Sequence, residues 1–232
     1  MRRLRLSRGH AVRQRHAAFS RIGSHRHLSS YATLILAGGY REAGESGRWR
    51  VEPGMVVVHA AGEAHADWFG DRPTELIDFD LPSTMPAGVY LCGDTDALAR
   101  SILEGEEWTE FTPLAAVLGE TDWPDLLAAA LRGNPALTIG GWASEHGLQA
   151  ETVSRRFGQA YGVTPARYRL GIRIKGAVAS LTAGEARLSD VAAANGFADQ
   201  SHMTRALKAA TGATPAQLRN VKSVQDAGAT AV

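Results

Sequence analysis

The sequence predicts a multidomain chain of mixed α and β structure, in which an N-terminal antiparallel β-barrel precedes an all-α domain with two helix-turn-helix units. The 232 residues exceed the length of one typical domain. Apolar residues alternate in the first part of the chain and follow the period of a helix in the last part. The last part also contains an internal repeat, which predicts a duplicated unit.

The barrel is predicted over residues 1–92. Four short stretches are rich in β-branched and aromatic residues and are separated by Gly-rich turns, which is typical of antiparallel strands. These stretches are Tyr31–Leu36, Arg48–Val51, Met55–His59 and Glu75–Asp80.

Residues 93–133 are predicted to connect the two domains as amphipathic helices. Ala97–Leu103 and Asp125–Leu131 have helical spacing of their apolar residues. Their apolar faces pack on the barrel in one interpretation and mediate dimerisation in the other.

The repeat lies in residues 134–220. Each copy predicts a helix, a Gly-opened turn and a second helix that ends at a further Gly and a Thr-Pro. One long helix, from Pro165 to a stop at Gly184, is predicted between the copies. The repeated pairs are Ala143/Ala192, Gly147/Gly196, Leu148/Phe197, Arg155/Arg205, Phe157/Leu207, Gly162/Gly212, Thr164/Thr214, Pro165/Pro215 and Arg169/Arg219.

The second helix of each copy has one apolar stripe and one polar stripe. Asp199 is placed to cap the second helix of the second copy. The stripes predicted to be buried are Val153, Phe157, Ala160 and Tyr161 in the first copy, and Met203, Ala206, Leu207 and Ala210 in the second. The outward residues are Gln149, Glu151, Ser154 and Arg155, then Ser201, Thr204, Arg205 and Lys208.

Charge is segregated along the chain. Residues 29–131 carry five Arg against eighteen acidic residues, whereas residues 132–232 carry twelve Lys and Arg against six. The basic C-terminal part therefore suggests a polyanionic partner, with DNA, RNA and a membrane surface all open on charge alone. Residues 1–28 carry eight Arg and no acid. The Arg-rich start, Met1–Arg15, is predicted to be a solvated, loosely ordered arm, the alternative being a nucleic-acid arm.

Cys92 is the only cysteine, which excludes an internal disulfide and a cysteine-built metal site. No stretch approaches the roughly 18 apolar residues of a membrane span. A cytoplasmic protein with no membrane partner is expected. Residues 221–232 lack a pattern and are predicted to be a disordered tail.

Residues 136–219 closely resemble the DNA-binding domain of the bacterial AraC/XylS family of transcription regulators. The second unit, Leu188–Lys208 followed by Gly212–Pro215, carries the family signature. The resemblance implies a non-enzymatic transcription regulator that binds double-stranded DNA, responds to a small-molecule effector, forms a homodimer and contacts RNA polymerase. The predicted DNA-binding residues are Gln149, Glu151, Ser154, Arg155, Gln200, Ser201, Thr204, Arg205 and Lys208.

The N-terminal part resembles a cupin barrel, which many regulators of this family use as a sensor. The resemblance rests on two histidines followed by Gly39, and on Gly54, Gly62 and a third histidine. It implies an effector or divalent-metal site at His25, His27 and His65, with organic-ligand contact or simple packing as the alternatives. Tyr31 and Ala32 stand where the cupin pattern has an acidic ligand. Further residues expected near the mouth are Glu63, Asp67 and Trp68.

Two other functions compete with the regulator. A metal-dependent cupin enzyme with an accessory nucleic-acid-binding domain explains the barrel but not the repeat. An RNA-binding or scaffolding protein lacks the expected aromatic stacking platform. The duplicated helix-turn-helix in a basic segment therefore favours a DNA-binding regulator.

Overall fold

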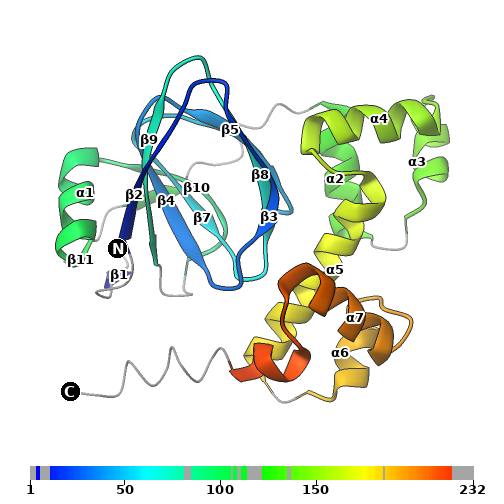
Figure 1. Cartoon of the computed structure of the whole chain (residues 1–232). Coiled ribbons are helices and arrows are strands. Elements are labelled where there is room, and N and C mark those ends of the chain that lie inside the picture. Colours follow the sequence, from blue (N-terminus) through cyan, green and yellow to red (C-terminus); the bar gives the residue numbers. More distant parts are fainter. Residues whose placement is uncertain are drawn as a thin grey trace.

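The computed structural model describes residues 4–5, 11–80, 85–105, 107–108, 111–113, 122–134, 137–184 and 186–220. Figure 1 shows strands gathered on one side of the molecule and most helices on the other. The strands and α1 form what we call the β domain, and α2 to α7 form the helical domain. The predicted order of β structure followed by helical structure is confirmed.

The β domain consists of two antiparallel sheets and a short strand pair, β1 (Leu4–Arg5) with β11 (Glu107–Trp108). The first sheet has the order β12 (Phe111–Pro113), β10 (Gly88–Cys92), β7 (Met55–His59), β4 (Tyr31–Ala37), β9 (Thr74–Asp80) and β2 (Ala11–His16). The second has the order β3 (Arg21–Arg26), β8 (Ala64–Phe69), β5 (Tyr40–Gly44) and β6 (Gly47–Val51).

The space between the two sheets differs in character from one end to the other. At one end it is apolar, because side chains of both sheets, among them Ile35, Val57 and Phe69, form one buried cluster. At the other end the same alternation of the strands turns ionisable side chains inward. Polar groups are costly to bury, so a polar end in a small core points to a functional site.

The segment predicted to connect the domains is more varied than two helices. α1 (Thr95–Glu104) covers the six-stranded sheet, where Leu98 and Ile102 join its core. β12 then returns the chain to that sheet beside β10. α2 (Trp123–Gly133) belongs instead to the helical domain, where Leu127 and Leu131 are fully buried. The two predicted helices are therefore confirmed, and β12, which lies between them and was not predicted, completes an edge of the six-stranded sheet.

Two helix-turn-helix units and a joining helix make up the rest of the helical domain. The units are α3 (Ile139–Glu145) with α4 (Ala150–Tyr161), and α6 (Leu188–Ala194) with α7 (Gln200–Thr211). The joining helix is α5 (Pro165–Ala183), which ends at Gly184 as predicted. Gly147 and Gly196 have φ angles of 66° and 72°, so the left-handed turn predicted for each copy is confirmed.

Some local predictions are corrected. Residues Ala11–Arg15 of the predicted loose arm belong to β2, because they pair with β9 and Arg13 forms an ion pair with Glu75. Ala210, predicted to be buried, is exposed. The predicted disordered tail, residues 221–232, lies outside the described residues.

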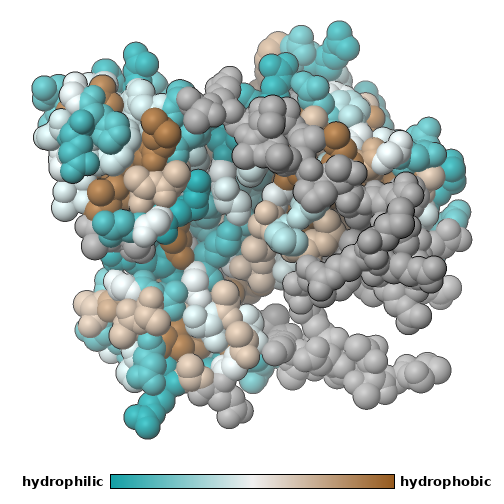
Figure 2. Space-filling model, turned by 180° about the vertical axis from the view of Figure 1, so that it is seen from behind, coloured by the Kyte–Doolittle hydropathy of each residue, from teal (hydrophilic) through white to brown (hydrophobic). Residues whose placement is uncertain are grey.

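Hydrophilic side chains predominate over the described surface on the face shown in Figure 2, and hydrophobic residues lie there in small patches. Among the described helices, none combines the length and apolar character needed to cross a membrane.

Candidate DNA-binding surface and histidine cluster

The second helix of each unit is held by its apolar stripe and leaves its polar stripe accessible. In α4, Val153, Phe157 and Tyr161 are buried. In α7, Met203 and Leu207 are buried, and the Asp199 side chain caps the first turn by accepting a bond from the His202 amide at 2.6 Å. The predicted cap and these burial patterns are confirmed.

All nine predicted DNA-binding residues lie on or directly before these two helices. Ser154 and Thr204 are half-buried, and the other seven are exposed: Gln149, Glu151, Arg155, Gln200, Ser201, Arg205 and Lys208. Gln149 is the residue that precedes α4, and Glu151 lies in its first turn. Arg155 and Arg205 occupy equivalent places in α4 and α7, so an accessible guanidinium projects from the same position in the middle of each second helix.

The joining helix sets how far apart the two units lie. α5 has 19 residues, so it is about 28 Å long at 1.5 Å per residue. It is anchored in the second unit by Ile174, Val178 and Leu181, which share a buried cluster with α6 and α7. A continuous helix is stiff, and the relative placement of α4 and α7 therefore depends on α5.

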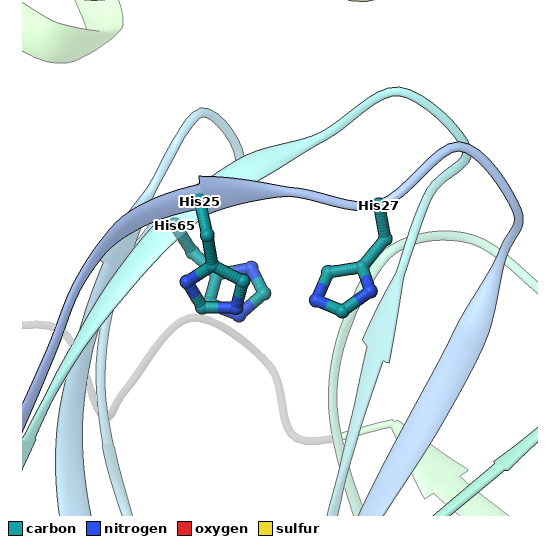
Figure 3. Close-up of side chains that lie close together, drawn as sticks. All are labelled: His25, His27 and His65. Atoms are coloured by element: carbon teal, nitrogen blue, oxygen red, sulfur yellow. The ribbon is translucent and has the colours of Figure 1, made fainter. Parts of the chain in front are cut away.

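The three predicted cupin histidines come together at the polar end between the sheets. His25 lies on β3 opposite His65 on β8, and His27 directly follows β3. The His25 and His65 rings are 4.3 Å apart between centroids, and the His27 ring is 5.0 Å from that of His25. Figure 3 shows the three imidazoles side by side beneath the two strands. One ligand atom of each lies within 4.8 Å of those of the other two, a spacing that fits a shared ion.

Two further residues of this cluster were missed in the sequence. His59, the last residue of β7, stacks on His65 with 4.4 Å between centroids. Glu42 of β5 brings a carboxylate oxygen to 3.6 Å from Nδ1 of His59. Strand alternation was the available signal, since Val57 and His59 must face the same side. Glu42, His59 and His65 form a second group whose ligand atoms lie within 4.8 Å of one another.

Burial dominates the electrostatics of the cluster. It lowers the pKa of His59 to about 3 and that of His65 well below its usual value. Both imidazoles are therefore neutral, which is the form in which histidine binds a metal. Burial, with Asp67 and Glu63 nearby, raises the pKa of Glu42 well above its usual value. Burial and the Asp78 carboxylate raise the pKa of Asp67 to about 7.

Tyr31, which stands where the cupin pattern has an acidic ligand, contacts two histidines of the cluster. Its hydroxyl lies 3.2 Å from Nε2 of His65 and its ring stacks on His59. Two buried atoms of the cluster, Nδ1 of His65 and Oδ1 of Asp67, have no hydrogen-bond partner among the described residues. Buried polar atoms of this kind are rare and call for a ligand, ion or water.

The expected mouth residues divide between the two faces of the four-stranded sheet. Asp67 points inward, as its 3.9 Å approach to His65 shows. Trp68 lies on the outer face, where its ring borders Gly162 of the helical domain, because adjacent residues of a strand alternate. The prediction that Trp68 borders the same mouth is therefore wrong.

The outer face of the four-stranded sheet is the docking surface for α5. Arg26, between His25 and His27, forms a nearly buried ion pair with Glu45, and the Tyr168 hydroxyl of α5 donates to the Glu45 carbonyl at 3.3 Å. Lys175 of α5 donates to Glu63 at 3.1 Å. Although burial opposes ionisation of Glu63, Lys175 and the Ser46 amide hold its pKa below the usual value.

A cavity of about 370 Å³ lies between this face and the helical domain. The β domain contributes Arg26 and Glu45, α5 contributes Arg167 and Tyr168, and α7 contributes Ala206 and Ala210. Ala210 is thus exposed because it faces the cavity rather than the core of its own unit.

Comparison with known proteins assigns the C-terminal part. Residues 142–220 match the helix-turn-helix domain family. ToxT from Vibrio cholerae is structurally similar over 90% of this chain and 97% of its own, with 10% identity and a TM-score of 0.44. The C-terminal domain of AraT, a response regulator from Geobacillus stearothermophilus, covers 42% of this chain and 84% of its own, with 22% identity and a TM-score of 0.40.

An AraC-type transcriptional regulator from Chromobacterium violaceum covers 42% of this chain and 88% of its own, with 21% identity and a TM-score of 0.39. No curated protein matches the sequence. TM-scores below 0.5 do not establish a shared function, so the assignment rests on the family match. Residues 142–220 are a helix-turn-helix domain, and the fold predicted for this part is confirmed.

Proposed function

We propose that this chain, whose residues 142–220 match a helix-turn-helix domain, is a DNA-binding transcription regulator of the AraC/XylS type. In this proposal α4 and α7 read two DNA half-sites under the control of a small effector bound by the β domain. The observation that carries the proposal is the equivalent exposure of Arg155 and Arg205 on the second helices of the two units. A metal-dependent cupin enzyme, which is the competing function, would not need two helices that read DNA.

Base reading is assigned to the long polar side chains of the two helices. Arg155 and Arg205 present guanidinium groups that suit O6 and N7 of guanine, and Gln200 suits adenine. Glu151 suits the amino group of cytosine, a donor from which a carboxylate can accept a hydrogen bond. The residues assigned to phosphate and sugar contacts are Gln149, Ser154, Ser201, Thr204 and Lys208.

The stiffness of α5 supports a fixed half-site spacing. Helix-turn-helix readers joined rigidly enter successive major grooves about one turn, or roughly 10 bp, apart. A helix of about 28 Å between the two units is compatible with that separation. The DNA sites should therefore be bipartite with one preferred spacing.

Adjacent side chains at β3 point to opposite faces of the sheet, which supports control of DNA binding by the β domain. His25 and His27 point into the space between the sheets, while Arg26 points outward to Glu45 and the docking surface of α5. Likewise His65 lies two residues after Glu63, which binds Lys175 of α5. A divalent metal or effector bound at His25, His27 and His65 thus shifts the same strands that hold the joining helix, and it favours one placement of the units over another.

Homodimerisation is assigned to the outer surfaces of α1 and α2. Leu103 on α1 is 56% exposed and Leu126 on α2 is 49% exposed, although the remaining apolar faces of both helices are already buried. We place the regulator in the cytoplasm, where a dimer on promoter DNA contacts RNA polymerase. Sedimentation of the wild type and of Leu103→Glu and Leu126→Glu tests the dimer. Equal sedimentation of all three would contradict pairing through these surfaces.

Selection of bound sequences from a random duplex library tests the function as a whole. We expect the full chain, at physiological salt, to enrich one bipartite motif, with specific binding at least about a thousandfold tighter than nonspecific binding. Binding that is equally tight to every sequence would contradict a sequence-specific regulator.

A further inference from the structure

We propose that the polar end between the sheets holds a divalent first-row metal ion at Glu42, His59 and His65, a position distinct from the predicted trio of His25, His27 and His65. The inference rests on the proposed function only in treating this end of the β domain as the sensor. It concerns which residues bind the ion there.

The two candidate positions differ in what they connect. His25 and His65 lie on paired strands of the four-stranded sheet, and His27 directly follows one of these strands. Glu42 and His65 belong to that sheet as well, but His59 belongs to the six-stranded sheet. An ion at Glu42, His59 and His65 therefore ties the two sheets together, whereas an ion at the trio does not.

Burial also separates the two positions. Glu42, His59 and His65 are 3%, 2% and 4% exposed. His25 and His27 are only half-buried. Displacing water from a preformed buried set costs little further ordering, so the buried position is the better prepared one.

The charge around the buried position calls for a cation. Among the described residues, the ion pairs of Glu42 and Asp67 are with His59 at 3.6 Å and His65 at 3.9 Å, and neither carboxylate pairs with a Lys or Arg. Lys175 and Arg26 are paired with Glu63 and Glu45 instead. A carboxylate buried without a Lys or Arg partner is costly, and a divalent ion bound to Glu42 offsets that cost.

Two buried atoms without hydrogen-bond partners also support a bound ion. Nδ1 of His65 and Oδ1 of Asp67 are buried and lack hydrogen-bond partners among the described residues, while Nε2 of His65 is already held by the Tyr31 hydroxyl at 3.2 Å. This hydroxyl orients the His65 ring from its second nitrogen, as outer-shell partners of metal-bound histidines do.

The donor set defines the class of ion. Two imidazoles and one carboxylate suit Zn²⁺, Fe²⁺ or Co²⁺, and they leave at least one coordination position free for water or an effector. Mg²⁺ and Ca²⁺, which prefer an all-oxygen shell, are disfavoured.

Titration of the full chain with Co²⁺ after chelator treatment tests the assignment, with the visible d–d absorption of the bound ion as the readout and Zn²⁺ as competitor. The variants are Glu42→Gln and His59→Gln, and His27→Gln is the matched control because it belongs to the predicted trio alone. We expect one ion per chain, with affinity reduced by more than about tenfold in the first two variants and unchanged in the control. Thermal unfolding with and without Zn²⁺ checks that each variant folds.

Loss of binding in His27→Gln with retention in Glu42→Gln and His59→Gln would place the ion at the predicted trio and overturn the proposal. So would a wild-type chain that takes up no ion. Should one variant fail to fold, the other carries the test. The same samples are assayed for selective DNA binding, which a failure of the metal position leaves intact and a failure of the regulator function removes.

Discussion

Lys175 of the joining helix α5 donates to Glu63 of the β domain at 3.1 Å, and Glu63 stands two residues before His65 of the histidine cluster. The start of β8 therefore connects the inner face of the four-stranded sheet with α5, the helix that holds both DNA-reading units. Glu63 is 3% exposed, and it also accepts bonds from the amides of Ser46 and Ala60. The contact has a fixed geometry on the sensor side.

Lys175→Met leaves the Glu63 carboxylate buried without its cation. Losing one partner of a buried pair costs about 3 to 5 kcal/mol, and since the Lys175 side chain is a quarter exposed, we expect about 1 to 3 kcal/mol of lost unfolding free energy. Urea denaturation measures it. The double variant with Glu63→Gln should recover most of the loss, and a single variant as stable as the wild type would show that the pair contributes nothing.

Arg205→Ala should reduce the affinity for the preferred DNA site by about 1 to 3 kcal/mol, because one bidentate contact to a guanine is lost. Fluorescence anisotropy on the preferred duplex and on a duplex changed at that base measures the effect. The loss should vanish on the changed duplex. An equal loss on both duplexes would mean that Arg205 does not read a base.

Lys208→Ala should weaken binding to all sequences alike, because a phosphate contact carries no sequence information. Its signature is the salt dependence of the affinity, whose slope should fall by about one. Affinities measured over a range of salt concentrations provide the test. A slope identical to that of the wild type would contradict a phosphate contact at Lys208.

Phe157→Ala should destabilise the first unit strongly. Its ring is fully buried and packs on Tyr161 and Tyr168, so its removal leaves a cavity costing about 3 to 5 kcal/mol. Gln159→Ala, an exposed change on the same helix, is the control and should stay within about 0.5 kcal/mol of the wild type. Denaturant midpoints compare the two. Similar midpoints for both variants would place the core of the unit elsewhere.

The helical domain followed closely from the sequence because its signals are local. Gly147 and Gly196 end the first helices, Asp199 caps α7, and the repeat fixes which residues are equivalent. Ala210 was misplaced because helical spacing shows which side of a helix is apolar but not which neighbour it meets. Its neighbour is the β domain, far away in the sequence.

The β domain was predicted less completely because its strands mix polar and apolar residues. β2 was taken for a loose arm since its Arg residues look solvated, whereas its backbone pairs with β9. His59 and Glu42 lie on different strands from the predicted histidines and are brought to them only by sheet pairing and stacking. The family resemblance identified His25, His27 and His65 as candidates. It did not identify Glu42, which supplies the carboxylate of the cluster.

Duplex selection carried out in parallel with the wild type, Arg155→Ala and Arg205→Ala tests most directly whether α4 and α7 read separate half-sites. The wild type should yield two half-sites about one helical turn, roughly 10 bp, apart. Each variant should lose sequence preference at one base of a different half-site and keep the other. Loss of preference in the same half-site in both variants, or unchanged motifs, would contradict two independent readers on one rigid helix.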